Sequence, residues 1–174
     1  MNLALDHWHI EPSSICTLKC PRCPRTEVPE SLLNRQLTLE FFQKQLGQTV
    51  VSQIRKITFC GNDGDPVYCN DLINIIRWIK SVNNNISIVI ITNGSHKKTD
   101  WWIELSEVLD EQDEINWSID GWNQESNEQY RINADWDSIL NGIVTFAAHN
   151  TKTYRVGSAI GFSFNENNID DMIN

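Results

Sequence analysis

Short apolar runs alternate along this chain with longer stretches whose apolar residues recur at helical spacing. Residues 54–60 (IRKITFC), 86–92 (ISIVIIT) and 115–119 (INWSI) have the length and the β-branched content of buried strands. Between them, residues 71–82 and 99–109 have the periodicity of amphipathic helices. Because strands separated by a helix pair in parallel, this alternation predicts an α/β protein built from β-α units.

The flanking segments extend the same alternation to about five strands. Residues 9–13 and 154–164 are expected to be the first and fifth strands, and residues 39–51 and 134–148 are expected to be helices. A further helix is expected over residues 167–174. The sheet is parallel in either of two architectures, a doubly wound sheet or a barrel, and both bind ligands beyond the carboxyl ends of the strands.

Polar and glycine residues stand where each of these strands ends. Because the ends of parallel strands meet at one edge of the sheet, the topology predicts a single site there. The segments that would form it are residues 16–23, 61–66, 92–94, 118–121 and Asn165.

Composition restricts the class of protein. At 174 residues, with 40% hydrophobic and 21% charged residues, the chain fits one domain with a buried core. No apolar run approaches the ~20 residues of a membrane-spanning helix, and we expect no secretion signal. The net charge of -9 argues against a nucleic-acid partner, because binding the phosphate backbone needs a basic surface. We therefore expect a cytoplasmic protein that does not contact membranes.

Five cysteines give the first chemical indication. Three of them, Cys16, Cys20 and Cys23, are spaced C-x3-C-x2-C, while Cys60 and Cys69 stand apart. An odd number with three clustered suits metal binding better than disulfides. Three thiolates on one loop can hold three irons of a [4Fe-4S] cluster and leave the fourth iron open to a small molecule.

The cysteine spacing, directly after the first strand, resembles the signature of radical S-adenosylmethionine (radical SAM) enzymes. The other motifs of that family follow in its order along nearly the whole chain. They are a glycine-rich loop similar to G-G-E-P at residues 59–66 (FCGNDGDP), T-N-G at 92–94, S-x-D-G at 118–121, Y-R at 130–131 and the fifth strand end at 164–165.

The resemblance implies an enzyme whose [4Fe-4S] cluster reductively cleaves S-adenosylmethionine (SAM). The resulting 5'-deoxyadenosyl radical would abstract hydrogen from a substrate that the sequence does not identify. A low-potential donor, flavodoxin or ferredoxin, would supply the electron. The resemblance also assigns the cluster to Cys16, Cys20 and Cys23.

The same resemblance assigns the SAM contacts by motif position. The loop after the second strand would meet the amino group of SAM through backbone carbonyls, and the planar guanidinium of Arg131 would pair with its carboxylate. The complete predicted set is Gly61, Asn62, Asp63, Gly64, Asp65, Thr92, Ser118, Asp120, Arg131 and Asn165.

The chain departs from the family pattern in two places. Asp65 stands where the family usually has glutamate, and the loop is longer than G-G-E-P. Radical SAM barrels commonly have six strands, whereas five are expected here. The fold expected is therefore a partial parallel (β/α) barrel, with residues 1–174 forming one radical SAM core domain whose C-terminal part is missing.

A different class of protein would place the same cysteines in a non-catalytic module. In that alternative, Cys16, Cys20 and Cys23 bind structural zinc, or hold a cluster without chemistry, and Cys60, Cys69 or a histidine completes the set. For Cys60 and Cys69 themselves, packing in the core is the favoured interpretation.

Overall fold

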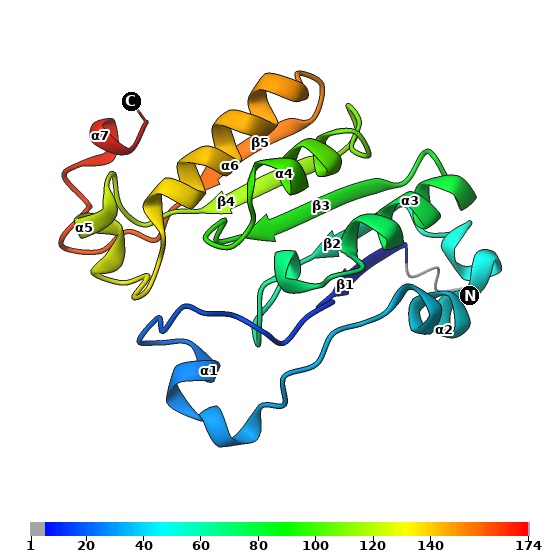
Figure 1. The fold of residues 1–174 in the computed structure, drawn as a ribbon, viewed down its shortest axis with the longest axis horizontal. Helices are drawn as coiled ribbons and strands as arrows, with labels where there is room; N and C mark the ends of the chain where they lie inside the picture. Colours follow the sequence, from blue (N-terminus) through cyan, green and yellow to red (C-terminus); the bar gives the residue numbers. More distant parts are fainter. Residues whose placement is uncertain (1–5, 174) are drawn as a thin grey trace.

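The computed structural model describes residues 6–173 and contains one parallel sheet of five strands. The strands lie side by side in the order in which they occur along the chain (Figure 1). They are β1 (His7–Ile10), β2 (Lys56–Phe59), β3 (Ser87–Thr92), β4 (Glu114–Ser118) and β5 (Tyr154–Ser158). This order makes β1 and β5 the two edges of the sheet.

Helices connect the strands. They are α1 (Pro24–Glu27), α2 (Leu39–Val51), α3 (Leu72–Val82), α4 (Thr99–Ser106), α5 (Gln124–Glu128), α6 (Trp136–His149) and α7 (Ile169–Ile173). Because parallel crossovers are right-handed, a sheet that follows the chain order has its crossover helices on one face. Figure 1 shows α3, α4 and α6 on the same side. The doubly wound alternative is thereby excluded, and the sheet is a segment of a barrel.

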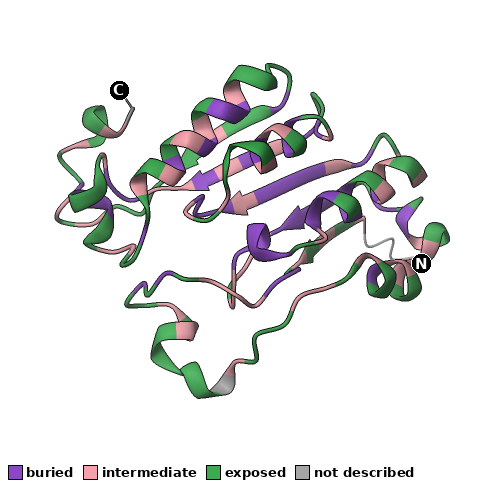
Figure 2. Cartoon of the chain, in the orientation of Figure 1, coloured by how far each residue is buried: buried purple, intermediate pink, exposed green. Residues whose placement is uncertain are grey.

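The face of the sheet under the helices is the hydrophobic core. Its strand residues are Ile57, Phe59, Ile88, Ile90, Ile115 and Trp117, all buried. Trp102 of α4 and Phe146 of α6 both pack on Trp117, with ring centroids 6.0 and 5.9 Å away. Figure 2 shows this burial along the strands and the inner sides of the helices. None of the helices in residues 6–173 has the length and apolar character needed to cross a membrane.

The opposite face of the sheet carries polar side chains, and we call it the open face. The strand register places His9 beside Thr58, and Thr58 beside Val89. His7 Nε2 lies 3.0 Å from Thr58 Oγ1, and the His7 and His9 rings are 4.6 Å apart. Asn116 follows on β4 and is half-buried. Thr58 and the apolar Val89 are nevertheless buried, so solvent reaches this face only in part.

The first strand differs from the expected residues 9–13. It ends at Ile10, because the chain then turns away at Pro12, which has no N–H for the sheet. Ser13 forms an antiparallel bridge with Gln36 instead. The pairing partner is distant in sequence, so local pattern does not reveal it.

The fifth strand is shorter than the expected residues 154–164. It ends at Ser158, after which side-chain hydrogen bonds from Asn165 hold the chain in turns. Asn165 donates to Ile160 O and accepts from Phe162 N. The helices expected from the sequence agree with the observed bounds to within a few residues, and residue 174 of the last one lies outside the described residues.

Candidate functional site

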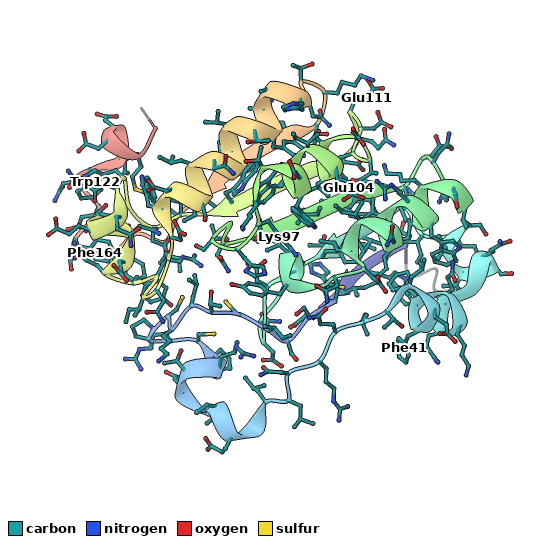
Figure 3. All side chains as sticks on the ribbon, in the orientation of Figure 1. Phe41, Lys97, Glu104, Glu111, Trp122 and Phe164 are labelled. Carbon is teal, nitrogen blue, oxygen red and sulfur yellow. The ribbon has the colours of Figure 1, made fainter. Side chains whose placement is uncertain are left out.

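A cavity of about 370 Å³ lies at the carboxyl ends of the middle strands, beside the loop between β1 and α1. Its volume falls within the ~300–1,000 Å³ of typical small-molecule sites. We call it the cysteine cavity. Several sulfur atoms gather near the loop that precedes α1 (Figure 3). The predicted site residues that line the cavity are Cys16, Cys20, Cys23, Gly61, Asn62, Gly64, Asp65, Thr92, Ser118 and Arg131.

The three clustered cysteines are free thiols; Cys20 is buried, and Cys16 and Cys23 are half-buried. Burial raises the pKa of the Cys16 thiol to about 11, although a backbone hydrogen bond at Leu18 opposes this. Burial also raises the pKa of Cys20, and the charge of Arg131 counteracts it. Thiols of this kind become thiolates when a metal takes the place of the proton.

The spacing of the thiols bears on which metal group suits them. Within residues 6–173, no three His, Cys, Asp or Glu side chains are arranged around one ion position. A structural zinc ion needs four ligands at one centre, whereas the thiolates of an iron–sulfur cluster bind different irons. Three thiols that line one cavity could therefore serve as ligands to three irons of one cluster.

Asp65 lines the cavity, but its carboxylate is engaged by the protein. It is 4% exposed. Oδ1 accepts hydrogen bonds from Val67 N and Thr92 Oγ1, and Oδ2 accepts two from Asn93. Burial raises the pKa of Asp65, and these hydrogen bonds work in the opposite direction. The side chain thus joins the ends of β2 and β3.

Arg131 reaches the cavity from the loop after α5. Its Nε donates to Asp120 Oδ2 at 2.7 Å, and the Asp120 side chain is fully buried. The other carboxylate oxygen of Asp120 accepts from Ile160 N at 2.7 Å. Asp120 accepts a hydrogen bond from Nε of Arg131 and not from the two outer nitrogens of its guanidinium. Those outer nitrogens can therefore donate to an anionic group in the cavity.

The glycine-rich loop over residues 61–64 is held from two sides. Glu11 accepts hydrogen bonds from Asn62 N, Asn62 Nδ2 and Asp63 N, at 3.0, 2.7 and 3.1 Å. Arg25 donates to Asp63 O at 2.9 Å and also to Ser14 O. A side chain on Gly64 would collide with the backbone of Ser13, so glycine is required for this close approach.

Three of the predicted residues do not line the cysteine cavity. Asp63 binds Glu11 and Arg25, and Asp120 stands behind Arg131. Asn165 donates to Asp120 O at 2.8 Å and lines a separate groove between β5, α6 and α7. These residues support the site from outside the cavity.

Three residues at the site were not among the predicted cluster ligands or SAM contacts, although Asn93 lies within the predicted segment 92–94. Glu11, Cys60 and Asn93 each stand just beyond the end of a strand, and Cys60 and Asn93 line the cavity. Cys60 Sγ lies 3.9 Å from His9 Nδ1, so it faces the open side of the sheet and is not packed in the core. Cys69, by contrast, is fully buried in the core as expected. The sequence signal that could have identified these residues is their position directly after a strand.

Comparison with known families agrees with this geometry. The model of the radical SAM superfamily matches residues 10–174. The chain belongs to the radical SAM superfamily.

Curated radical SAM relatives are longer than this chain. GTP 3',8-cyclase of Limosilactobacillus fermentum is 23% identical over 172 residues, covering 97% of this chain and 50% of that protein. Molybdenum cofactor biosynthesis protein 1 of Drosophila melanogaster is 27% identical over 164 residues, covering 91% and 27%. The chain therefore spans half or less of the length of these relatives.

Solved structures give the same fold. SuiB of Streptococcus suis bound to the precursor peptide SuiA matches with a TM-score of 0.73 and 16% identity, over 97% of this chain and 36% of that one. The structure of anSMEcpe with bound AdoMet and Cp18Cys peptide matches with a TM-score of 0.70 and 18% identity, over 96% and 46%. The prediction of a partial radical SAM barrel is confirmed.

The residues of the cysteine cavity fit the cofactors of the radical SAM superfamily. Three thiols on one loop would supply the ligands for three irons of a cluster. Arg131 supplies a cation at the same cavity, which suits a carboxylate ligand. The cavity also has room for a small molecule beside the thiols.

Proposed function

We propose that this chain is a radical SAM enzyme domain that holds a [4Fe-4S] cluster through Cys16, Cys20 and Cys23. The observation that carries the proposal is the shared cavity of these thiols and Arg131. Residues that are distant in sequence meet there because the ends of successive parallel strands lie at one edge. The open fourth iron would then be the place where SAM binds.

The residues of the chain act by binding and orientation. Asp120 fixes Arg131 through Nε, and the outer nitrogens of Arg131 pair with the carboxylate of SAM. The loop over residues 61–64, clamped by Glu11, turns backbone groups toward the amino group of SAM. Thr92 and Ser118 line the cavity from β3 and β4. When bound, the cofactors supply a 5'-deoxyadenosyl radical that abstracts hydrogen from the substrate.

The substrate, in this proposal, lies over the open face of the sheet. His9 and Cys60 are adjacent there, and Cys60 also lines the cysteine cavity. The imidazoles of His7 and His9 and the amide of Asn116 offer hydrogen bonds to a polar substrate. A low-potential donor such as flavodoxin or ferredoxin supplies the electron. The proposed compartment is the cytoplasm, because the five cysteines are free thiols and a reducing compartment keeps thiols in that state.

The test is anaerobic reconstitution with iron and sulfide, followed by electron paramagnetic resonance of the reduced protein. A [4Fe-4S] signal that changes when SAM is added supports an open iron that SAM ligates. Tightly held zinc without a cluster would instead support the structural-metal alternative. A cluster whose spectrum does not change when SAM is added would contradict the proposed SAM site.

A pair of matched variants tests the ligand assignment. Cys20→Ala is expected to abolish cluster assembly, because it removes one of three thiolates. Cys69→Ala should leave iron content unchanged, since Cys69 is buried in the core and donates to Leu37 O at 3.3 Å. Iron and sulfide analysis compares the two, and equal loss from both would overturn the assignment.

A further inference from the structure

Asn93 connects a buried carboxylate to one of the clustered thiols. Its Nδ2 lies 2.6 Å from Asp65 Oδ2 and 3.6 Å from Cys16 Sγ. Asn93 is 5% exposed and Asp65 4% exposed, so solvent has little access to either side chain. Asn93 follows β3, Asp65 follows β2 and Cys16 follows β1. The chain order of the sheet is what brings them together.

Hydrogen bonding fixes which end of the Asn93 amide faces the sulfur. Asn93 Oδ1 accepts from Ser95 N at 3.0 Å, and the Asp65 carboxylate can only accept. The NH₂ group must therefore point toward Asp65 and Cys16. One of its hydrogens is taken by Asp65 Oδ2, and the other is directed at Cys16 Sγ.

The backbone beyond Asn93 holds this orientation. Gly94 has a φ of +74°, and its N–H donates to Thr92 Oγ1 at 3.1 Å. A side chain on Gly94 would press on Trp117 Cδ1 at 3.0 Å. Asn93 N also donates to Asp65 Oδ2 at 2.7 Å, so the residue is anchored by both backbone and side chain.

We propose that Asn93 is a positioning residue that donates a hydrogen bond to the Cys16 thiolate and raises the reduction potential of the cluster. This inference rests on the proposed function. A donor to a ligating sulfur stabilises the more negative, reduced cluster, so it makes reduction easier. Residues 92–94 were predicted to lie at the site, and the family resemblance assigned a SAM contact there only to Thr92.

The test measures the midpoint potential of the reconstituted cluster without SAM, by spectroelectrochemical titration. Asn93→Ser keeps an oxygen acceptor near Ser95 N but loses the donor to Cys16, so its potential should shift to more negative values. Tyr68→Phe is the matched control, because it removes the hydrogen bond between Tyr68 and Thr17, next to Cys16 in the chain, without changing the bonds of Asn93. Its potential should remain near that of the unmodified protein.

The outcomes separate this inference from the proposed function. An unmodified protein that binds no cluster overturns both. A cluster that assembles, with the same potential in Asn93→Ser, overturns the role of Asn93 alone. An equal shift in Tyr68→Phe does so too, because the effect would then come from a general disturbance of the loop that carries Cys16.

A second measurement detects the hydrogen bond directly. The unmodified protein is labelled with ¹⁵N in the side-chain amide of asparagine, and pulsed electron paramagnetic resonance is recorded on the reduced cluster. A resolved coupling to an asparagine side-chain nitrogen supports the hydrogen bond to Cys16. The absence of such a coupling overturns it. Asn62 Nδ2 is bound to Glu11 Oε1 at 2.7 Å and Asn133 Nδ2 donates to Thr17 O, so loss of the coupling in Asn93→Ser identifies the nitrogen as that of Asn93.

Discussion

Arg131 and Asp120 form an ion pair that solvent hardly reaches. The Asp120 side chain is fully buried, and that of Arg131 is 16% exposed. Removing one partner of such a pair is costly because it leaves an uncompensated charge in the interior. Asp120 also accepts from Ile160 N, so it fixes the guanidinium relative to the chain after β5. The pair therefore presets a cation at the cysteine cavity before any ligand arrives.

We predict that Arg131→Ala lowers the affinity for SAM about 10- to 100-fold, since a charge-assisted hydrogen bond contributes roughly 1.5–3 kcal/mol. Iron content should stay unchanged, because Arg131 is not a cluster ligand. Equilibrium dialysis of the reconstituted protein measures the affinity. Arg77→Ala, which removes an exposed ion pair with Glu104, serves as the control and should leave it unaltered. Unchanged affinity in Arg131→Ala would remove that residue from the site.

At the scale of single residues, sequence reasoning found candidates but not the direction in which they point. The cysteines are close in sequence, so their spacing is a local property. Asp65 was expected to contact SAM through its backbone, and its carboxylate accepts from Asn93; Asp120 was expected at the cofactor, and its carboxylate accepts from Arg131. Which partner a carboxylate selects depends on chain segments far away in sequence, and no local pattern records this.

At the scale of elements, helix and strand types were predictable because each has a clear apolar period. The helix over Leu72–Val82 buries the apolar residues at i, i+3, i+4 and i+7 that identify it in the sequence. The ends of β1 and β5 were not predictable. After β1 the chain turns away at Pro12 and Ser13 pairs with the distant Gln36, and after β5 the distant Asp120 accepts a hydrogen bond from Ile160 N.

The contact between α4 and α6 depends on a residue without a side chain. A Cβ on Gly142 would lie 2.7–2.9 Å from the indole of Trp102, which is itself fully buried. We predict that Gly142→Ala lowers the free energy of unfolding by about 1–3 kcal/mol, because overpacking forces the core to shift.

Gly161→Ala is the control for Gly142→Ala, because nothing lies within 4 Å of a Cβ built there. Urea denaturation of both variants measures the difference in the free energy of unfolding. Equal stability of the two variants would show that α6 moves away from α4 at little cost.

At the scale of the whole molecule, apolar side chains gather on the surface around β5, α6 and α7. Those exposed by more than about a third of their surface are Leu140, Val144, Tyr154, Ile160 and Ile169. A groove of about 880 Å³ lies among the same elements. Figure 3 shows Trp122 and Phe164 at this end of the molecule and Phe41 at the other. Exposed apolar surface beside an open strand edge favours association.

We predict that Val144→Glu reduces self-association of this chain at high concentration, since Val144 is 66% exposed on α6. Phe41→Glu adds the same charge to α2, where Phe41 is 50% exposed, and should reduce self-association less. Sedimentation velocity over a concentration series measures both variants. An equal effect would indicate that net charge, and not this surface, governs association.

The chain order of the sheet also has a consequence for how the protein is made. Each strand pairs only with the strand synthesised before it and the one synthesised after it. During translation, every new strand therefore finds its partner already outside the ribosome, and the sheet grows at one edge. No strand has to insert between two that have already paired. The edge at which the sheet grows is always the one that the next strand will pair with, so each newly made strand waits only for the next one.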